Sequence, residues 1–363
     1  MVVAVHLGRM LQHQDVAPSL LAFIQRHDWF ADGEAGVDIF FVISGFVITY
    51  ATPRALVSLR DVSAFLLRRC ARIYPAYWAL SLPLLAWRYW KADPATLPHG
   101  HLELAAWIFL LPYTHVPPLR VAWTLVFEVF FYVAAALIFI WPLRWRKYLA
   151  AAWLTFLLTV AFLPLGSESW YYDLRVYTSP FPIEFIGGMF IAFWPMKRPS
   201  PLSPSVAAVL FVMGFVSMPL LGSALNGDSS TLLRVAAFGP GAWVIVWVVV
   251  QMDALGKWEW FKYWTWLGDR SYSLYLLHLP ILNGLYPVAI RLLPKPNAFE
   301  LAAITLGIFA VLAVAIDLSY RFIEKPMQKA AKHLAPHTEL KRKKPPEKTT
   351  RSAARDEASE AAE

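Results

Sequence analysis

The sequence has little charge and almost no cysteine for its length. Charged residues make up 16% of its 363 residues and hydrophobic residues make up 58%, a balance that argues against a soluble multidomain protein. Cys70 is the single cysteine, so an internal disulfide framework is excluded. The chain also lacks a Walker-type phosphate loop, a Cys/His metal pattern and a Gly-x-Ser-x-Gly elbow. ATP-driven pumping, zinc hydrolysis and a serine-hydrolase triad therefore lose support, and we expect no metal and no permanently bound cofactor.

Apolar runs recur along most of the chain, many of them near the 20 residues that an α-helix needs to cross a bilayer. We therefore predict an all-α polytopic membrane protein with about ten transmembrane helices. An internal repeat is not apparent, which weakens a transporter built from inverted halves but leaves it open. Breaks at charged residues, proline and glycine place the expected spans near 1–12, 36–52, 73–90, 122–142, 148–165, 180–196, 205–222, 232–252, 271–293 and 299–323.

Positive charges set the expected orientation of these spans. Lys and Arg gather in short loops between spans, and such loops face the cytoplasm, so the net charge of +8 needs no nucleic-acid partner. If the spans near 73–90 and 122–142 cross in opposite directions, the short run at 102–111 must be re-entrant or interfacial. Both termini then face the cytoplasm. Residues 328–363 are basic and polar, and we predict a disordered cytoplasmic tail there.

The first span is short. Only about ten apolar residues precede the polar stretch from Gln12 to Gln14, whereas a full crossing needs roughly 20. We expect either that translation starts upstream of Met1 or that the first helix is truncated at its N-terminus.

Two ionisable residues within expected spans are candidates for chemistry, because each charge at a span centre costs roughly 2.5–3.5 kcal/mol on insertion scales. His6 lies in the first apolar run and can take a proton near neutral pH, so it reads as a general base or as a packing histidine. Glu128 lies within two turns of the start of its span. Its carboxylate can orient a histidine, hold a sugar hydroxyl or form a structural pair.

Three further ionisable residues have simpler readings. Asp38 and Glu184 lie in the first turns of their spans, where interfacial capping is the expected role. His278 lies two residues before Pro280, which leaves a backbone carbonyl without its helical donor. His278 can therefore serve a kinked helix or line a functional pathway.

A basic segment follows the Phe-rich span. Arg68 and Arg72 are one helical turn apart and are expected to share a face that Arg69 flanks. Guanidinium groups bind phosphate oxygens in pairs, which favours recognition of a nucleotide diphosphate or a similar anion. The alternative is a cytoplasmic loop whose arginines only obey the topology rule.

The order of these motifs resembles that of the acyltransferase 3 family over residues 1–327. The family comprises integral membrane acyltransferases, many of them bacterial O-acetyltransferases of surface polysaccharides such as O-antigen. The residues that carry the resemblance are His6, Gly-Val-Asp-Ile-Phe-Phe-Val-Ile-Ser-Gly-Phe at 36–46, Arg-Arg-Cys-Ala-Arg-Ile-Tyr-Pro at 68–75, Trp-Thr-Leu-Val-Phe-Glu at 123–128, Leu-Gly-Asp-Arg-Ser-Tyr-Ser-Leu-Tyr-Leu-Leu-His at 267–278, and Phe-Ile-Glu-Lys-Pro at 322–326.

The resemblance implies a membrane-embedded acyltransferase domain at 1–327 in the bacterial inner membrane. Acyl-CoA, most simply acetyl-CoA, would be the cytoplasmic co-substrate, and a hydroxyl of a cell-surface glycan or lipid-linked saccharide would accept the acyl group. By motif position, His6 and Glu128 would be catalytic and Arg68, Arg69 and Arg72 would bind the donor. Supporting roles would fall to Asp38, Ser44, Trp123, Tyr132, Glu184 and His278.

Two other functions remain open from the sequence. A transporter of glycan or lipid-linked sugar would use Glu128 and His278 to line its pathway. A non-catalytic membrane partner would fit the incomplete first helix. Membrane lipids are expected partners in every case.

Overall fold

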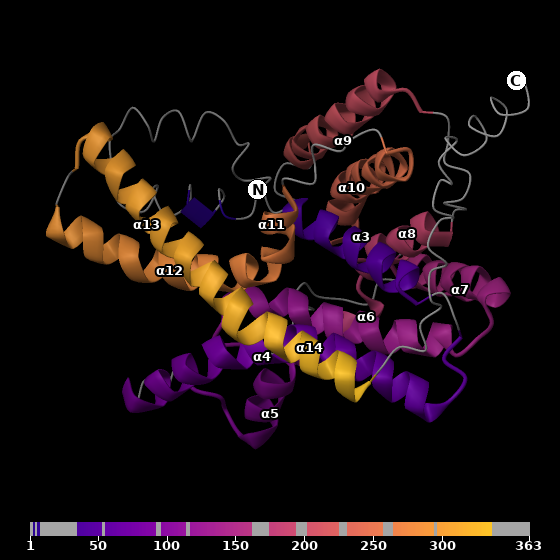
Figure 1. Cartoon of the computed structure of the whole chain (residues 1–363), viewed down its shortest axis with the longest axis horizontal. Helices are drawn as coiled ribbons and strands as arrows, with labels where there is room; N and C mark the ends of the chain where they lie inside the picture. Colours follow the sequence, from indigo (N-terminus) through magenta and orange to yellow (C-terminus); the bar gives the residue numbers. More distant parts are fainter. Residues whose placement is uncertain are drawn as a thin grey trace, which may run out of the picture.

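The computed structural model describes residues 3, 6, 7, 35–52, 55–91, 96–113, 117–161, 174–193, 202–224, 231–256, 264–293 and 296–335, and these residues form helices and no strands (Figure 1). The all-α prediction is therefore confirmed for this part of the chain. The helices are α3 (Ala35–Tyr50), α4 (Leu59–Lys91), α5 (His101–Phe109), α6 (Trp123–Phe139), α7 (Leu143–Ala161), α8 (Pro182–Phe193), α9 (Pro204–Ala224), α10 (Thr231–Ala254), α11 (Thr265–Asp269), α12 (Ser271–Leu292), α13 (Ala298–Ser319) and α14 (Lys325–Leu334).

Five stretches of the described chain are helical, long and apolar enough to cross a membrane. Two shorter apolar helices, α3 and α8, pack closely against each other. These features support a polytopic membrane protein, while the expected total of ten spans and their orientation stay predictions. Most of the expected span at 1–12 lies outside the described residues. The five stretches are Arg120–Phe139, Pro204–Gly222, Thr231–Ala254, Ser271–Leu292 and Phe299–Leu334.

The basic segment is part of a long helix and not a loop. The sequence placed a span at 73–90 after a cytoplasmic loop, but α4 runs without interruption for 33 residues, with Pro75 and Pro83 inside it. Arg69 and Arg72 lie ten and thirteen residues after Leu59, which is about 15 and 20 Å along the helix axis. Arg69 and Arg72 therefore lie within the helix bundle. This corrects the expectation that the basic segment forms a cytoplasmic loop.

Glycines let α3 and α8 approach backbone to backbone. A Cβ added to Gly45 of α3 would overlap the carbonyl oxygen of Phe185, and one added to Gly188 of α8 would overlap that of Val42. Small residues at such contacts are typical of helix packing in membranes, where close approach supplies the attraction. The contact fixes α3 against α8.

Phenylalanines fill the space between α3, α6 and α8. The ring of Phe41 lies 5.3 Å from that of Phe131, which stacks on Phe185 at 4.4 Å. Phe127 meets Phe181 edge-on at 5.2 Å. All five side chains are fully buried. The Phe-rich motif at 36–46 therefore sends Phe41 into this core, and aromatic pairs of this kind add to the stability from burial.

The short run expected at 102–111 forms α5, which at nine residues spans only about 14 Å. Its last carbonyls lack helical donors, and side chains of α4 supply them. Tyr77 donates to Trp107, Trp78 donates to Ile108 at 2.8 Å, and Tyr74 donates to Phe109 at 2.8 Å. A helix that ends inside a bundle needs such partners. The geometry fits a segment that does not cross the membrane, although its re-entrant character stays a prediction.

Arg146 ties together three helix ends. It lies between the expected spans at 122–142 and 148–165, where the basic residues of a cytoplasmic loop are expected, yet its side chain is fully buried. Its guanidinium donates to the backbone oxygens of Thr52 at 2.6 Å, Trp141 at 3.2 Å and Phe139 at 3.3 Å. These bonds join the end of α3 to the α6–α7 corner.

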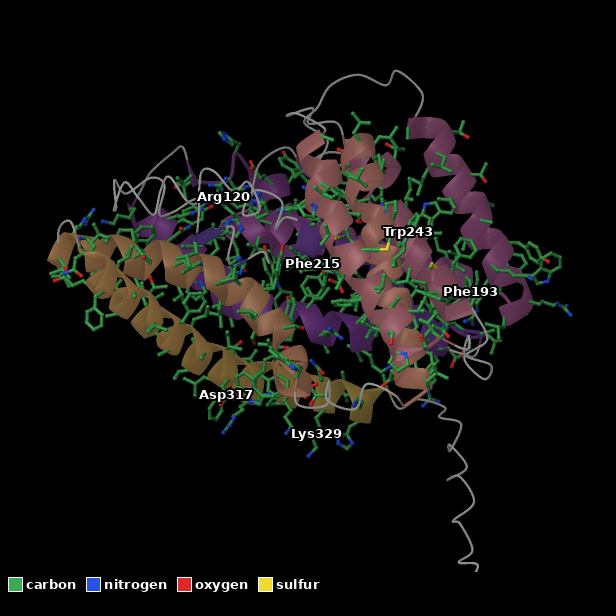
Figure 2. The ribbon with its side chains drawn as sticks, turned by 90° about the horizontal axis from the view of Figure 1, so that it is seen from above. Arg120, Phe193, Phe215, Trp243, Asp317 and Lys329 are labelled. Atoms are coloured by element: carbon green, nitrogen blue, oxygen red, sulfur yellow. The ribbon has the colours of Figure 1, made fainter. Side chains whose placement is uncertain are left out.

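The last helices run on further than expected. A single π-helical turn, η7 (Tyr320–Glu324), joins α13 to α14, and α14 packs along α4 (Figure 1). The tail predicted from residue 328 is therefore helical as far as Leu334, because α14 docks on α4. Asp317 and Lys329 lie along the outer edge of this long element (Figure 2).

The glycine contact predicts which helix positions tolerate a methyl group. Gly45→Ala should lower the apparent melting temperature of the detergent-purified protein or abolish folding, because the backbone of α8 would have to move. Gly284→Ala is the matched control within a helix, since nothing lies within 4 Å of its added Cβ. Alanine there should be neutral or stabilising by about 0.5–1 kcal/mol. Equal melting temperatures for the two variants would contradict this account of the α3–α8 contact.

Candidate active site

A cavity of about 280 Å³ lies among α3, α4, α6 and α12. Helix α3 presents one face to it, and Phe41, Asp38 and Gly45 lie on its other faces. The wall is mostly apolar with a few polar groups that converge, as in many small-molecule sites. Its lining residues are Gly36, Val37, Ile39, Phe40, Ile43, Ser44, Val47 and Ile48 of α3, Arg69 and Arg72 of α4, Glu128 and Tyr132 of α6, and Ser271, Tyr272 and Tyr275 of α12.

Glu128 is the central acidic group of the cavity. It is 4% exposed, and its Oε1 accepts a hydrogen bond from the Tyr132 hydroxyl at 2.6 Å and one from the Ser44 hydroxyl at 3.4 Å. Its Oε2 has no hydrogen-bond partner among the described residues. One carboxylate oxygen is therefore held in place while the other is available to a ligand.

Arg69 and Arg72 supply positive charge to the same cavity. The Arg69 guanidinium lies over the rings of Phe65, at 5.6 Å, and Tyr132, at 5.9 Å. Arg72 is attracted by the carboxylates of Glu128 and Glu324. Both arginines are half-buried, so an anion that entered the cavity would meet them away from bulk water, where charge-assisted hydrogen bonds are strong.

Arg68 occupies a different position from the other two arginines. Its guanidinium donates to the backbone oxygen of Ala335 at 2.6 Å, just after α14 ends. The cavity therefore uses the face of α4 that carries Arg69 and Arg72, three residues apart, and not the predicted face shared by Arg68 and Arg72.

Glu324 lies outside the cavity lining but attracts Arg72, a role that sequence reasoning missed. Neighbouring lysine and arginine residues in the sequence offer it a local ion pair, but its side chain is 2% exposed and accepts a hydrogen bond from Ser273. The hydroxyl oxygens of Ser273 and Ser319 lie 2.8 Å apart, so Ser319 can donate to Ser273 while Ser273 donates to Glu324. The π-helical turn η7 places Glu324 there, and such turns are frequent at functional sites. The motif at 322–326 was the available signal.

His6 and His278 lie beside each other at the α12 side of the cavity. Their ring centroids are 5.2 Å apart, and the ring of Tyr275 lies 5.8 Å from that of His278. Tyr275 lines the cavity and donates to the backbone oxygen of Val121 at 2.9 Å. His6 is thus connected to the cavity wall through a histidine and a tyrosine.

The Nδ1 of His278 lies 3.2 Å from the backbone oxygen of Leu274, to which it can donate. Its Nε2 has no hydrogen-bond partner in the described part of the chain. This arrangement leaves a free nitrogen on a buried imidazole, which is more than a helix kink requires.

Asp38, Glu184 and Trp123 lie outside the cavity lining. Asp38 and Glu184 are fully buried, and Asp38 pairs with Arg234 at 2.7 Å, which corrects the expectation of interfacial capping. Arg234 was overlooked because it falls near the start of its span. Trp123 packs on Phe181 with ring centroids 5.6 Å apart, as part of the aromatic core.

The cavity combines two chemical capacities. Its guanidinium groups can bind an anion, and Glu128 can accept a proton or a hydroxyl hydrogen bond through Oε2. Within the described residues, the acidic, histidine and cysteine side chains form no group of three that could hold a metal ion.

Comparison with known proteins adds the family. The family model described as an acyltransferase domain, acyltransferase 3, matches residues 1–320. The chain is 30% identical over 313 residues to the exopolysaccharide production protein ExoZ of Rhizobium meliloti, covering 82% of this chain and 90% of that protein. It is 28% identical over 360 residues to the peptidoglycan O-acetyltransferase OatA of Listeria monocytogenes, covering 86% of this chain and 54% of OatA.

A third relative is the putative peptidoglycan O-acetyltransferase YrhL of Bacillus subtilis, which is 27% identical over 353 residues. The alignment covers 85% of this chain and 53% of YrhL. The chain thus spans about half the length of OatA and YrhL but most of ExoZ. The search of solved structures found no match.

Proposed function

This chain belongs to the acyltransferase 3 family, and we propose that it moves an acyl group, most simply acetyl, from acyl-CoA to a hydroxyl of a cell-surface glycan or lipid-linked saccharide. The observation that carries the proposal is the single cavity that joins Arg69 and Arg72 to Glu128. An anion-binding pair and a carboxylate that can hold a hydroxyl, placed on one cavity, suit transfer from a phosphate-bearing thioester to a hydroxyl.

The donor would be held through its phosphates. Acyl-CoA carries phosphate groups at one end and the thioester at the other, and guanidinium forks match phosphate oxygens. Arg69 and Arg72 would bind the phosphates nearest the pantetheine arm, so that the thioester enters the apolar part of the cavity beside Phe40 and Ile43. Arg68, which is tied to Ala335, would contribute at the rim.

The acceptor hydroxyl would attack the thioester carbonyl. The C–S bond breaks as the new C–O ester bond forms, and the hydroxyl proton passes to a base and then to the sulfur, which leaves as the free thiol of CoA. His6 is the proposed base, and its neighbour His278 links it to the cavity wall. Glu128 would orient the acceptor through Oε2, with Tyr132 and Ser44 holding the other oxygen.

The names of the relatives support a glycan acceptor. ExoZ is described by exopolysaccharide production and OatA by peptidoglycan O-acetylation. An acceptor of this chemistry would reach the cavity within the bacterial inner membrane, between the cytoplasmic donor and the growing surface polymer. O-antigen and other lipopolysaccharide sugars belong to the same acceptor class.

Release of CoA tests the reaction and separates it from transport. Membranes that contain the protein should release thiol from acetyl-CoA in an acceptor-dependent way and transfer labelled acetyl to the glycan. Glu128→Gln should lower the rate about 100-fold, because the amide cannot hold the hydroxyl as the carboxylate does. Acceptor movement across the membrane without CoA release would instead indicate a transporter.

Donor recognition predicts a difference between two arginines of the same helix. Arg72→Gln should raise the KM for acetyl-CoA about 10- to 100-fold, because a charged hydrogen bond to phosphate contributes about 1.5–3 kcal/mol. Arg60→Gln is the matched control, since Arg60 is exposed at the start of α4. If both variants saturate with acetyl-CoA as the parent protein does, the arginines of α4 only set topology.

The proposed base predicts a histidine-specific loss. His6→Ala should lower acetyl transfer by about 10²–10⁴-fold without loss of protein from the membrane, which is the range for general-base catalysis. His333→Ala, at an exposed position of α14, should leave the rate unchanged. Undiminished transfer by the His6 variant would remove His6 from the mechanism.

A further inference from the structure

A second polar cluster lies behind α3, outside the cavity. Asp38 of α3 forms an ion pair with Arg234 of α10, with 2.7 Å between Oδ2 and the guanidinium nitrogen. The carboxyl of Glu184 from α8 lies against that of Asp38 and within the field of Arg234. Both acidic side chains are 0% exposed. Three helices therefore meet at two carboxyl groups and one guanidinium.

Three carboxyl oxygens of this cluster lack a donor. Oδ1 of Asp38 and both carboxyl oxygens of Glu184 have no hydrogen-bond partner among the described residues. A buried polar atom without a partner costs about 1–3 kcal/mol, and more if it is charged. Such a group in a native structure points to something that is bound there.

The surroundings do not supply the missing positive charge. The Arg234 guanidinium lies over the rings of Phe181 at 5.7 Å and Phe238 at 5.2 Å. Trp243, labelled in Figure 2, donates to the backbone oxygen of Glu184 at 3.3 Å and not to its carboxyl. The first two turns of α10 carry one further polar side chain besides Arg234, Thr231, and it is uncharged. Two ionised carboxylates would thus leave one buried negative charge uncompensated within the described part of the cluster.

We propose that Asp38, Glu184 and Arg234 form a buried proton-binding site, in which the carboxyl of Glu184 holds the proton beside the Asp38–Arg234 ion pair. The proton on Glu184 gives the facing oxygen of Asp38 a donor and makes the cluster neutral. Two carboxyl groups that lie together share one proton for the same reason in other proteins, because like charges at close range do not both ionise.

The ligand of this site is a proton and not a metal ion, because hard cations take six or more oxygen ligands and two carboxyl groups supply too few. Within the described residues, no three acidic, histidine or cysteine side chains are grouped so that they could hold a metal ion, and this holds for the cluster too. The site differs from the cavity in the face of α3 that it uses. Asp38 faces α10, whereas its neighbours Val37 and Ile39 line the cavity.

The bound proton has a positioning role. Helix α3 supplies Ser44 and the Phe40 wall to the cavity, and the cluster holds the first turn of that helix to α8 and α10. Loss of the proton would place an unpaired negative charge between the helices. The first turn of α3 would then be held less firmly against α8 and α10, and the cavity wall that α3 forms would be less well positioned.

Infrared spectroscopy of the purified full-length protein tests the proposal through Glu184→Gln. Glutamine is the isosteric neutral replacement for a protonated glutamate, so this variant should fold and keep its thermal stability. The difference spectrum between the parent protein and this variant should contain one C=O stretching band of a protonated carboxylic acid. Glu300→Gln is the control, because Glu300 accepts from the Asn297 N–H at the start of α13, outside the cluster, so this variant should keep the acid band.

Asp38→Asn and the double variant Asp38→Asn/Glu184→Gln complete the test. With one carboxyl group left beside Arg234, Asp38→Asn should also lose the acid band, whereas the double variant removes both carboxyl groups from the cluster and should lose stability strongly. A difference spectrum of Glu184→Gln that shows only a carboxylate band would overturn the proposal. Stabilisation of the parent protein by sodium but not by choline, absent in Glu184→Gln, would also overturn it by showing a bound metal cation.

Discussion

The attraction between Arg72 and two buried carboxyl groups, Glu128 in the cavity wall and Glu324 outside it, is the interaction on which the site depends. Arg69 and Arg72 are half-buried inside a helix bundle, where an uncompensated charge is expensive. Glu128 of α6 and Glu324 of η7 attract Arg72 and offset that cost. Glu128 is held in turn by Tyr132 and Ser44. Charge balance therefore fixes α4, α6 and the α13–α14 junction around the same space, while one oxygen of Glu128 is left for a ligand.

Helix α3 transmits this arrangement to the rest of the bundle. One face lines the cavity, and the others contact α8 through Gly45 and the aromatic core through Phe41. The ion pair of Asp38 with Arg234 adds a third attachment at its first turn. A helix of 16 residues is short for a membrane crossing, so its position in the bundle must depend on packing and polar contacts with its neighbours. Residues of the Phe-rich motif at 36–46 therefore lie on different faces of α3, which contact the cavity, α8 and the aromatic core.

Composition and motif order were enough to predict an all-helical membrane protein of the right family, and the motifs at 36–46, 68–72 and 123–132 do meet at one cavity. The sequence could not predict which arginines face it. That choice depends on the bond from Arg68 to the backbone oxygen of Ala335, a partner 267 residues away in the chain that no local pattern predicts. Glu324 and Arg234 were missed for a related reason, because each has a local explanation and its true partner lies more than 50 residues away in the chain.

The central claim is that Arg72 and Glu128 act on one bound donor and acceptor in one cavity. A double-mutant cycle measures this directly, with acceptor-dependent CoA release determined at one subsaturating acetyl-CoA concentration for the parent protein, Arg72→Gln, Glu128→Gln and the double variant. The account predicts strong non-additivity, so that the second substitution lowers the rate much less than it does alone. Effects that multiply independently would contradict it, because the charges of Arg72 and Glu128 would then not interact across the cavity.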